Sequence, residues 1–477
     1  MAVKQFAGLA SDSREVKPGY LFAALPGMKA NGAEFVKDAV GRGAVAVLGR
    51  PEVAPSAAAL GVRFIADENP RKALARCAAQ FFAAQPKTVA AITGTNGKTS
   101  VTVFLREIWT ALGKRAASMG TIGVVTPESE KQLNHTTPGP IELHRILAEL
   151  KRDGIDCLAL EASSHGLDQF RLDGVDIAAV GFTNITRDHM DYHPTFEAYL
   201  ACKLRLFREL ARDGAAAVVN ADAEHARDFI AAAKARGLRL LTVGEKGESL
   251  KLLARAPHGD GQSLTVTHDG TTYVVALPLA GAFQASNALI AAAFAIGLGE
   301  DARAVFAALA DLKGAPGRLE KVATARNGAP VYVDYAHTPD ALENVLTALR
   351  PHTKGKLSVV FGCGGDRDRG KRPLMGAVAA KFADRVIVTD DNPRSEDAAA
   401  IRKEALAGCP GAQEIGERAR AIRAGIAALG EGDVLVIAGK GHESGQIMGS
   451  VVHPFSDRDE TIKAAISLGG RSAERKA

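Results

Sequence analysis

The sequence predicts an α/β protein of three domains, and two observations support this. The chain has 477 residues, whereas a single domain usually holds about 100–200. From residue 88 onward, apolar runs of strand length alternate with helix-like segments, which is typical of parallel sheets with crossover helices. We therefore expect a small N-terminal α/β domain, a central domain with a mostly parallel sheet and a C-terminal α/β domain, at residues 1–86, 87–314 and 315–477.

The expected N-terminal domain contains strand-like runs at 20–25 and 44–48, separated by Pro and Gly. Apolar residues at helical spacing then predict a helix over 71–84. Gln85 and Pro86 punctuate the chain directly after this helix. We therefore place the first domain boundary after Pro86.

The two later domains are predicted from runs of apolar residues bounded by turn residues. In the central domain, alternating runs around Asp269-Gly270 also predict a local antiparallel hairpin. A Gly- and Pro-containing linker at 313–317 precedes the third block, which we expect to be Rossmann-like. The predicted strands are 88–93, 157–160, 178–182, 216–219, 263–267 and 272–276 in the central domain, and 331–333, 357–361, 385–389 and 434–438 in the third.

Composition excludes several classes of protein. Apolar residues make up 47% and charged residues 24%, which excludes a disordered or fibrous chain. The formal charge of +5 is slight and dispersed, and only 5% of residues are aromatic, so neither nucleic acid nor a membrane surface is an expected partner. The apolar stretch 288–298 is shorter than the roughly 20 residues that span a bilayer and predicts a buried helix.

The cellular compartment is predicted from the N-terminus and the cysteines. The N-terminus has no apolar signal-peptide region. The five cysteines form no CxxC pair and have no regular spacing. They are typical of reduced, mostly buried thiols, so we expect a cytoplasmic protein.

A glycine-rich loop, GTNGKTS at 94–100, lies between a predicted strand and a predicted helix. Its glycines let backbone amides turn toward an anion, while Lys98 adds a charge and Thr99 a hydroxyl for Mg²⁺. The spacing departs from the standard phosphate loop, because Ile92 stands where that pattern has a glycine. The alternative is a plain Gly-rich turn. Because the strand, the glycines and the Lys-Thr pair coincide, we predict ATP or GTP phosphate binding.

Two further segments carry side chains that could bind a metal ion. Glu161 follows a predicted strand and could hold Mg²⁺ near the phosphates, although a lone carboxylate there is equally consistent with a surface group. The segment TRDHMDYH at 186–193 concentrates two His and two Asp, so His189 or His193 could ligate a metal. A turn rich in capping Asp is the alternative.

Lys203 lies on the apolar stripe of a predicted helix over 195–208. It follows Phe196 by seven residues and precedes Phe207 by four, so it shares their face. The spacing alone favours a side chain that snorkels outward. The alternative is a buried lysine of lowered pKa whose neutral amine reacts with CO₂ to form a carbamate, a metal-binding carboxylate.

Charged residues follow three predicted strands of the third block. In open α/β sheets, ligands lie outside the C-terminal ends of the strands. Arg394 offers a planar fork for a carboxylate, and Asp391 and Glu443 can accept hydrogen bonds from an ammonium group. Such a set suits an amino acid with two ammonium and two carboxylate groups. Surface salt bridges near Pro and Gly turns are the alternative.

These motifs together resemble the Mur ligase family of ATP-dependent amide-forming enzymes in peptidoglycan synthesis. The resemblance extends over essentially the whole chain. Two of its motifs, DDNPR (390–394) and GKGHE (439–443), resemble the branch that adds the third residue of the stem peptide, and DNPR is the pattern of members that add meso-diaminopimelate rather than L-lysine. The resemblance is carried by GTNGKTS (94–100), Glu161, SSHGLDQFR (163–171), TRDHMDYH (186–193), KLRLF (203–207), DYAHTPD (334–340), GCGGDRDRGKRP (362–373), DDNPR (390–394) and GKGHE (439–443).

The resemblance implies a function for each domain and a role for each matching residue. The N-terminal domain would bind uridine, the central domain ATP, and the C-terminal domain the amino acid. The catalytic group would be Lys98, Glu161, His189 and a carbamylated Lys203. The ATP site would contain Gly94, Thr95, Asn96, Gly97, Lys98, Thr99 and Ser100, with Asn287, Arg318, Asp334 and His337 on the adenosine side or coupling the third domain to ATP. The metal ligands would be Thr99, Glu161, His189 and Lys203. The UDP-substrate site would contain Ser13, Thr136, Thr137, Ser163, Gln169 and Arg171, and the diaminopimelate site Arg367, Asp391, Asn392, Pro393, Arg394, Gly439 and Glu443.

Two positions depart from the family pattern. His135 stands before Thr136 where Asn is usual, which bears on a substrate contact. Gln284 replaces an Asn that is common after the preceding Phe, which bears on an adenine-side detail.

The implied reaction uses only small-molecule substrates: ATP, UDP-MurNAc-L-Ala-D-Glu and meso-diaminopimelate. The D-Glu γ-carboxylate would attack the γ-phosphate, assisted by Lys98 and Mg²⁺, and the amine would then displace phosphate from the acyl phosphate. Domain closure would exclude water from that intermediate. We expect a monomer.

Two rival functions remain at this stage. One is another amide ligase, such as a lysine-adding relative or a folylpolyglutamate synthase. Arg394 and the Ser13 segment argue against both. The other is a switch or motor NTPase, which would not need a third α/β domain with charges clustered at its strand ends.

Overall fold

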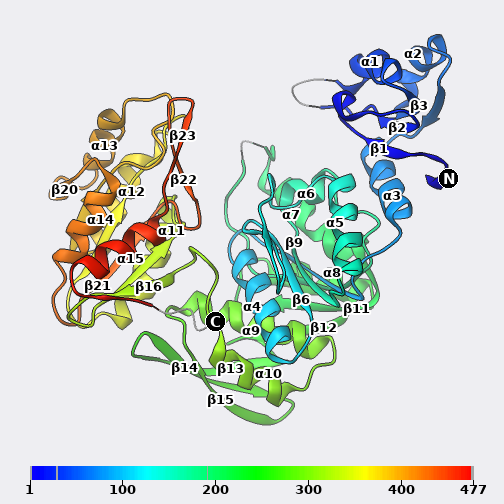
Figure 1. Cartoon of the computed structure of the whole chain (residues 1–477). Coiled ribbons are helices and arrows are strands. Elements are labelled where there is room, and N and C mark those ends of the chain that lie inside the picture. Colours follow the sequence, from blue (N-terminus) through cyan, green and yellow to red (C-terminus); the bar gives the residue numbers. More distant parts are fainter. Residues whose placement is uncertain (1–2, 28–30, 191, 474–477) are drawn as a thin grey trace. The chain divides into compact units, whose positions relative to one another are not determined.

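The computed structural model describes residues 3–27, 31–190 and 192–473 (Figure 1). By the density of internal contacts the chain forms two compact units, which are described separately. Within the described residues, no helix is both long enough and apolar enough to cross a membrane. The domain boundaries predicted at residues 86 and 314 do not coincide with the limits of these two units, and they stay predictions. The first unit is Met1–Ser249 with Ile290–Asp301, and the second is Leu250–Leu289 with Ala302–Ala477.

The first unit begins with a four-stranded parallel sheet in the order β1-β2-β3-β4. Helix α3 (Pro70–Phe82) follows it, and the Asn69 side chain caps its first turn by accepting from the Lys72 amide. The helix ends at Ala83, which has a left-handed backbone conformation, just before Gln85-Pro86. The other elements are β1 (Gly8–Ala10), β2 (Tyr20–Ala23), β3 (Ala44–Gly49), β4 (Arg63–Ala66), α1 (Val36–Gly41) and α2 (Ala54–Ala59).

The central sheet of the first unit has the order β12-β11-β10-β5-β9-β6-β7-β8. Strands β12 to β6 in this order are parallel, and β7 and β8 continue the sheet antiparallel. The strands are β5 (Thr88–Thr93), β6 (Ala116–Gly120), β7 (Gly123–Val125), β8 (Glu130–Lys131), β9 (Cys157–Glu161), β10 (Ile177–Phe182), β11 (Ala211–Asn220) and β12 (Arg239–Gly244).

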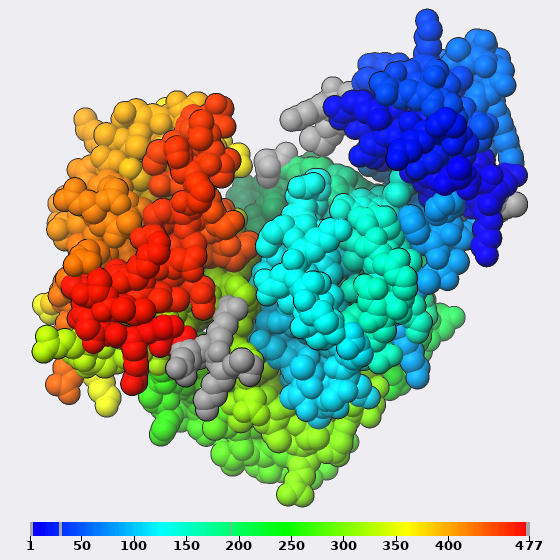
Figure 2. All heavy atoms as spheres, viewed as in Figure 1, coloured from blue at the N-terminus to red at the C-terminus, as the bar shows by residue number. Residues whose placement is uncertain are grey.

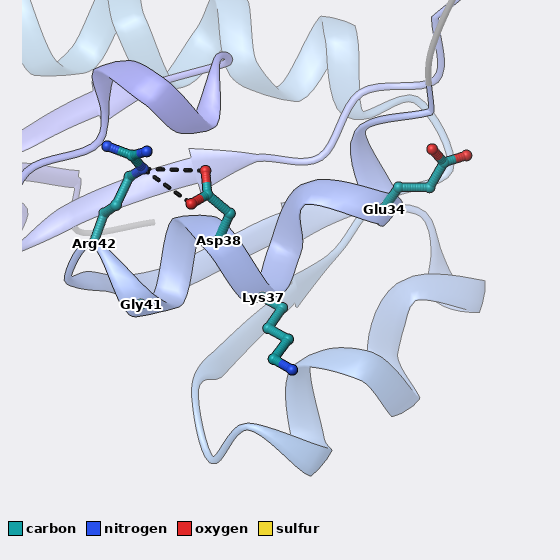
Figure 3. Close-up of a pocket in the computed structure, with 5 residues that line it drawn as sticks. All are labelled: Glu34, Lys37, Asp38, Gly41 and Arg42. Carbon is teal, nitrogen blue, oxygen red and sulfur yellow. Dashed lines mark hydrogen bonds and ion pairs between the residues drawn. The ribbon is translucent and has the colours of Figure 1, made fainter.

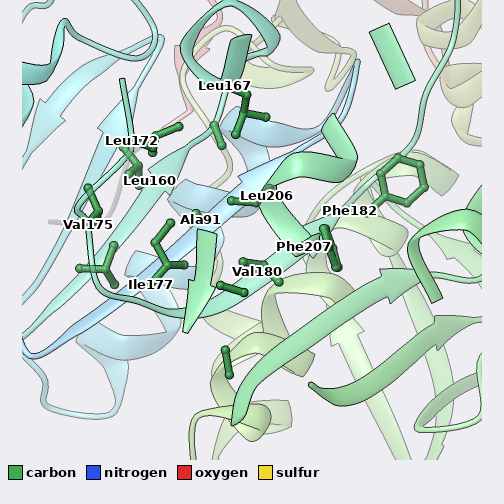
Figure 4. Packing of buried hydrophobic residues seen from close by; sticks show 14 of the residues in the cluster. Ala91, Leu160, Leu167, Leu172, Val175, Ile177, Val180, Phe182, Leu206 and Phe207 are labelled. Atoms are coloured by element: carbon green, nitrogen blue, oxygen red, sulfur yellow. The ribbon is translucent and has the colours of Figure 1, made fainter. Parts of the chain in front are cut away.

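Helices pack on this sheet and bury its apolar strands. Strands β9 and β10 are buried over their full length, as expected of parallel strands covered on both faces. Figure 4 shows part of this core, including Phe182 and Phe207. The Phe182 ring stacks on that of Phe229, with ring centroids 3.7 Å apart. The helices are α4 (Lys98–Ala111), α5 (Pro140–Arg152), α6 (Ser164–Asp168), α7 (Phe196–Arg205) and α8 (Ala226–Ala235).

The segment predicted as one helix over 195–208 forms two kinds of helix. The α-helical part, α7, covers Phe196–Arg205, and a π-helical turn follows directly over Leu206–Leu210. The predicted helix over 288–298 corresponds to the second half of α9 (Ala282–Gly297), and residues 288–295 are all buried. The boundary between the two units falls within this helix, after Leu289.

The second unit contains a three-stranded antiparallel sheet and a seven-stranded sheet. The first confirms the predicted hairpin, since Thr267 pairs with Thr272 across Asp269-Gly270. The second has the order β20-β19-β18-β21-β17-β16-β24, and its five strands β20 to β17 are parallel, as in a Rossmann-like fold. The strands are β13 (Leu250–His258), β14 (Gly261–His268), β15 (Thr271–Leu277), β16 (Glu320–Thr324), β17 (Pro330–Asp334), β18 (Leu357–Phe361), β19 (Arg385–Val388), β20 (Gln413–Glu414), β21 (Val434–Ala438) and β24 (Arg471–Ser472).

A separate two-stranded hairpin, β22 (Gly445–Met448) and β23 (Val451–Pro454), extends from this unit. Its tip side chains lie at the surface, coloured orange-red in Figure 2, and Val451 and Val452 are more than half exposed. The helices of the unit are α10 (Ala302–Ala308), α11 (Pro339–Leu349), α12 (Lys371–Phe382), α13 (Ala398–Leu406), α14 (Arg418–Ala427) and α15 (Asp457–Ser467).

Candidate active site

The phosphate loop joins β5 to α4 and is fixed to the end of β10. The Asn96 amide donates to Asn184 Oδ1 at 3.0 Å, and Thr183 Oγ1 donates to the Asn96 carbonyl at 2.5 Å. Gly94 has a φ of 151°, and a Cβ there would lie 1.9 Å from Thr183 Oγ1, so only glycine fits. A turn held in this way before a helix N-terminus is suited to bind an anion.

Lys98 is the first residue of α4, and its side chain curls back over the loop. Its Nζ donates to the carbonyls of Gly94 and Thr95 at 2.9 and 2.8 Å. Thr99 and Ser100 follow in the first turn and are buried. The structure thus brings all seven predicted phosphate-loop residues, 94–100, into one turn.

Lys203 is fully buried beneath this loop, so the local expectation of an outward, snorkelling side chain was wrong. Its Nζ donates to the Gly94 carbonyl at 2.7 Å and lies 4.4 Å from the centre of the Tyr199 ring. Burial, followed by repulsion from Lys98, holds the pKa of Lys203 well below its usual range. Within the described residues, no carboxylate forms an ion pair with it.

Glu161 ends β9 and is buried, which removes the alternative of a surface carboxylate. The backbone amide of Thr121 donates to Oε1 at 2.8 Å and the Thr121 hydroxyl to Oε2 at 3.1 Å. A Cβ at Gly120 would lie 2.1 Å from Oε1, so the strand end approaches the carboxylate closely. The Thr121 hydroxyl also lies 3.1 Å from that of Thr136, which links Glu161 to the predicted substrate residues.

The predicted UDP-substrate residues of the central domain form one hydrogen-bonded network. Thr137 Oγ1 donates to the Glu161 carbonyl at 2.8 Å and accepts from Ser163 Oγ at 3.0 Å. Arg171 donates to the Thr137 carbonyl at 2.6 Å and to Gln169 Oε1 at 2.8 Å. Burial lowers the pKa of Arg171. His135, which departs from the family pattern, is exposed beside this network.

Ser13 lies apart from this network in the N-terminal sheet domain. It is buried, and its hydroxyl helps to lower the pKa of Asp38, together with the Arg42 guanidinium. Asp38 and Arg42 form an ion pair that lines a shallow pocket on α1 with Glu34, Lys37 and Gly41 (Figure 3). Among the described residues, no hydrogen bond connects Ser13 to the group around Thr137.

The His189 ring lies among other aromatic rings. His189 is exposed and has a φ of 55°, and its ring lies 5.0 Å from that of His165. His193 is buried, with its ring 5.1 Å from that of Tyr199. Residues 3–27, 31–190 and 192–473 contain no group of three His, Cys, Asp or Glu side chains placed to hold a metal ion. The predicted set counts only Glu161 and His189 among these residue types, so this finding does not test it.

The predicted adenosine-side residues lie in the second unit. Asp334 ends β17, and its two oxygens accept from the amides of Leu319 and Ala336 at 2.6 and 2.7 Å. Burial raises the pKa of Asp334 to about 6, although Arg318 and the two amides act in the opposite direction. The guanidinium of Arg318 lies 4.5 Å from the centre of the Tyr335 ring.

The other two residues of this group differ in exposure. The His337 side chain is exposed and its Nδ1 lies 2.9 Å from the Tyr335 carbonyl, while desolvation by the surrounding protein lowers its pKa. Asn287 is buried, and its amide donates to Gln284 Oε1 at 3.5 Å. Gln284, the second departure from the family pattern, donates in turn to the Arg318 carbonyl at 2.9 Å.

The predicted amino-acid residues follow β18, β19 and β21 and converge at one sheet edge. Asn392 Nδ2 donates to Glu443 Oε2 at 3.0 Å, which joins the second and third loops. Arg394 Nη1 donates to the Gly365 carbonyl at 2.8 Å, which joins the second loop to the first. A Cβ at Gly364 would lie 2.9 Å from Arg394 Nη1 and 3.8 Å from Arg367 Cγ. The three loops therefore contact one another, and their role in binding an amino acid stays a prediction.

Asp391 and the glycine after β21 complete this edge. Asp391 is buried, and a Cβ at Gly439 would lie 2.7 Å from its Oδ2. Gly439 has a φ of 121°, so the close approach and the backbone both require glycine. Pro393 stands between Asn392 and Arg394, and its carbonyl would meet a Cβ at Gly365.

The β22–β23 hairpin holds the loop that carries Arg394. The Arg394 amide donates to the Ile447 carbonyl at 3.0 Å, and its carbonyl accepts from the Gly449 amide at 2.7 Å. These bonds maintain a left-handed backbone at Arg394, with a φ of 52°, which costs about 1 kcal/mol or more for a residue other than glycine. Gln446 Nε2 donates to the Asp391 carbonyl at 2.7 Å.

Three buried cations behind these loops were not identified from the sequence. Arg372 and Arg418 are fully buried and form ion pairs, Arg372 with Glu396 and Glu404 and Arg418 with Asp457. Lys440 is fully buried and pairs with Glu443 at 3.0 Å. The sequence signals were the place of Lys440 between the two glycines of GKGHE and that of Arg372 in GCGGDRDRGKRP.

Comparisons with known proteins agree with this arrangement. Three segments match described domains: residues 5–82 the "Mur ligase family, catalytic domain", 92–295 the "Mur ligase middle domain" and 317–441 the "Mur ligase, glutamate ligase domain".

Two similar relatives are named UDP-N-acetylmuramoyl-L-alanyl-D-glutamate–2,6-diaminopimelate ligase. One, from Bradyrhizobium diazoefficiens, is 58% identical over 98% of this chain and 96% of its own length. The other, from Caulobacter vibrioides, is 55% identical over 96% of this chain and 95% of its own length. A solved structure of a ligase with that name has a TM-score of 0.73 and 35% identity, covering 97% of this chain and 95% of its own.

The fold, the phosphate loop and these similarities define an ATP-dependent ligase that joins small molecules. The chain belongs to the Mur ligase family and acts in the synthesis of peptidoglycan precursors. The switch or motor alternative is therefore wrong. A folylpolyglutamate synthase of Mycobacterium tuberculosis has a TM-score of 0.63 at 20% identity, which shows a shared fold alone.

Proposed function

We propose that this ligase joins meso-diaminopimelate to the D-Glu γ-carboxylate of UDP-MurNAc-L-Ala-D-Glu, with ATP as co-substrate. The relatives at 55–58% identity carry the name of this activity. The observation that supports the choice of amino acid is the convergence of Arg394, Asn392 and Glu443 at one edge of the C-terminal sheet.

The charges of this edge complement an amino acid with a distal carboxylate. Arg394 is part-buried and uses Nη1 for the Gly365 carbonyl, so its remaining N–H groups are suited to a carboxylate. Glu443 and Asp391 are acceptors for an ammonium group. L-Lysine lacks the distal carboxylate and would leave the guanidinium without its anion, which costs on the order of several kcal/mol in a desolvated site.

The phosphate loop supports the activation step. The γ-carboxylate of D-Glu attacks the γ-phosphorus of ATP, an O–P bond forms, and the bond to the departing ADP breaks. Lys98 and the amides of residues 94–100 stabilise the charge on the phosphates. The amine of diaminopimelate then forms the C–N bond, phosphate leaves from the carbonyl carbon, and the amine loses a proton.

The donors near the loop fit Mg²⁺. Thr99 supplies a hydroxyl and Glu161 a buried carboxylate whose two oxygens each accept one hydrogen bond, so lone pairs remain for a cation. We place His189 in the same set. When bound, the ion would neutralise charge on the phosphoryl group in transfer.

Lys203 fits the same set as a carbamate. Its burial, with no carboxylate partner among the described residues, and its lowered pKa favour the neutral amine. The neutral amine adds to CO₂, an N–C bond forms and a proton leaves, which converts a buried cation into an oxygen ligand for the metal ion.

The experiment that tests the activity measures phosphate release from ATP by the purified protein. We expect release only when both UDP-MurNAc-L-Ala-D-Glu and meso-diaminopimelate are present. Equal rates with L-lysine would contradict the amino-acid assignment, and activity with a folate in place of the UDP substrate would contradict the acceptor. Mass spectrometry of the product should show one added diaminopimelate residue.

We place the reaction in the cytoplasm, since all five cysteines are free and buried. The protein is expected to act as a monomer on these small molecules, and its molar mass in solution tests this.

A further inference from the structure

Lys440 is a buried side chain inside the amino-acid edge for which the proposed reaction has no role. It is fully buried, and its Nζ donates to Asn392 Oδ1 and to Glu443 Oε2, each at 3.0 Å. Asn392 and Glu443 come from different loops, after β19 and β21. One ammonium group therefore connects two of the three loops that we assign to the amino acid.

The network around Lys440 fixes the orientation of the Asn392 side-chain amide. Asn392 Oδ1 accepts from two donors, Lys440 Nζ and the Ile447 amide at 2.9 Å, while Nδ2 donates to Glu443 Oε2. A flipped amide would turn its NH₂ group toward both donors and its oxygen toward a carboxylate. Because buried donors must find acceptors, the flipped state is strongly disfavoured.

The same network leaves one Glu443 oxygen for a ligand. Glu443 Oε2 accepts from both Lys440 and Asn392, whereas no such bond to Oε1 occurs among the described residues. Glu443 is about one-third exposed, so its carboxylate is held from the buried side and open on the other. A carboxylate with one oxygen anchored presents the second in a defined direction to an ammonium group.

We propose that Lys440 is a positioning residue for the amino-acid substrate, which sets the Asn392 amide and aims Glu443 at the ammonium group of the incoming amino acid. The inference rests on the proposed function only for the identity of that amino acid. Lys440 touches neither ATP nor the UDP substrate in this assignment, so its effect should be confined to one of the three substrates.

The test compares Lys440→Met with Lys463→Met in the full-length protein. Lys463 forms the same kind of ion pair, three residues from Glu460 at 2.8 Å, but its side chain is 70% exposed. For K440M we expect a rise in KM for diaminopimelate of about tenfold or more, the effect of losing one charged hydrogen bond. The KM values for ATP and the UDP substrate should stay within about twofold, and K463M should match the wild type.

A second variant covers the case in which K440M fails to fold. Lys440→Gln is shorter and neutral but keeps an NH₂ group that can donate to these acceptors, so it should raise the KM for diaminopimelate by a smaller factor. If KM for all three substrates changes together, or if KM for diaminopimelate is unchanged in a folded variant, Lys440 is structural only and the proposal is wrong. Should the wild type use L-lysine instead, the proposed function fails, and the effect of Lys440 is then measured on lysine.

Discussion

Two fully buried lysines among the described residues, Lys203 and Lys440, have opposite surroundings. Lys203, in the first unit, contacts a carbonyl and an aromatic face, and no carboxylate among the described residues pairs with it. Lys440, in the second unit, pairs with Glu443 and with the amide oxygen of Asn392. Burial of an ammonium group is costly unless it is paired.

This contrast indicates different purposes. The charge on Lys440 is compensated, so the lysine can serve as a fixed cation that positions its two partners. Lys203 has no carboxylate partner among the described residues, and its burial favours the neutral amine that the proposed carbamate requires. Arg372 and Arg418 follow the pattern of Lys440, since both are fully buried and both are paired with carboxylates.

The largest expected effect comes from Lys203→Met, which tests whether the buried lysine without a carboxylate partner is needed for activity. We expect ligase activity to fall at least about 1,000-fold, or about 4 kcal/mol of transition-state stabilisation, because the carbamate can no longer form. The thermal unfolding midpoint should not fall, since an uncompensated buried cation is replaced by an apolar side chain. Activity within tenfold of the wild type would refute the assigned role.

A labelling measurement serves as the control for that variant. Protein equilibrated with ¹³C-bicarbonate should give one carbamate carbon signal by NMR. The signal should be absent in K203M and retained in K440M. Because the carbamate forms from the neutral amine, the signal should weaken as the pH is lowered.

Asp457→Ala removes the carboxylate that pairs with the buried cation Arg418. Arg418 Nε and Nη2 lie 2.6 and 2.7 Å from the Asp457 carboxylate, and both side chains are fully buried. Removing one partner of a buried pair typically costs about 3–5 kcal/mol of unfolding free energy. Chemical denaturation should report this loss, and a change below about 1 kcal/mol would contradict it. The double variant R418M/D457A should recover part of the loss.

Asp334 is a buried anion whose hydrogen-bond partners are backbone amides, and it should give a distinct pH dependence. Its folded pKa of about 6 lies above the ordinary value of 3.8 for an aspartate, so between these values the folded state binds more protons. Stability from this group is therefore present at low pH and is lost as pH rises toward 6, by up to about 3 kcal/mol at 1.36 kcal/mol per unit. Thermal unfolding of D334N should lack this slope, whereas D340N, at an exposed position, should retain it.

Arg394→Ala should raise the KM for diaminopimelate about 30- to 100-fold, an effect of about 2–3 kcal/mol for a charged hydrogen-bonded pair. Any residual turnover of L-lysine should change little, because lysine has no distal carboxylate for the guanidinium. Arg420→Ala is the matched control, since its side chain is 79% exposed. An equal loss with both amino acids would assign Arg394 to the α-carboxylate instead.

The strands were predictable because their apolar runs are continuous. Residues 88–93, 357–361 and 434–438 were predicted with the bounds that the structure gives to β5, β18 and β21. The domain class and the phosphate loop follow from the same local signals. Helix ends were less accurate, since the π-helical turn after Arg205 has no local signal in the sequence.

The surroundings of the lysines could not be predicted from periodicity. Helical spacing placed Lys203 on the apolar face but favoured an outward side chain. What encloses its Nζ is a loop that begins 109 residues earlier in the chain. Likewise, one partner of Lys440 lies 48 residues away, at Asn392, so only the tertiary structure brings the two together. Recognition of the family supplied the role of Lys203, whereas nothing in the sequence supplied that of Lys440.

The β22–β23 hairpin has a consequence for engineering. Arg394 keeps its left-handed backbone through bonds to Ile447 and Gly449, which lie more than fifty residues further along the chain. Grafting DDNPR alone into an enzyme of different specificity would import the guanidinium without the scaffold that aims it. A chimera with this specificity would have to include both segments, residues 390–394 and 445–454, together.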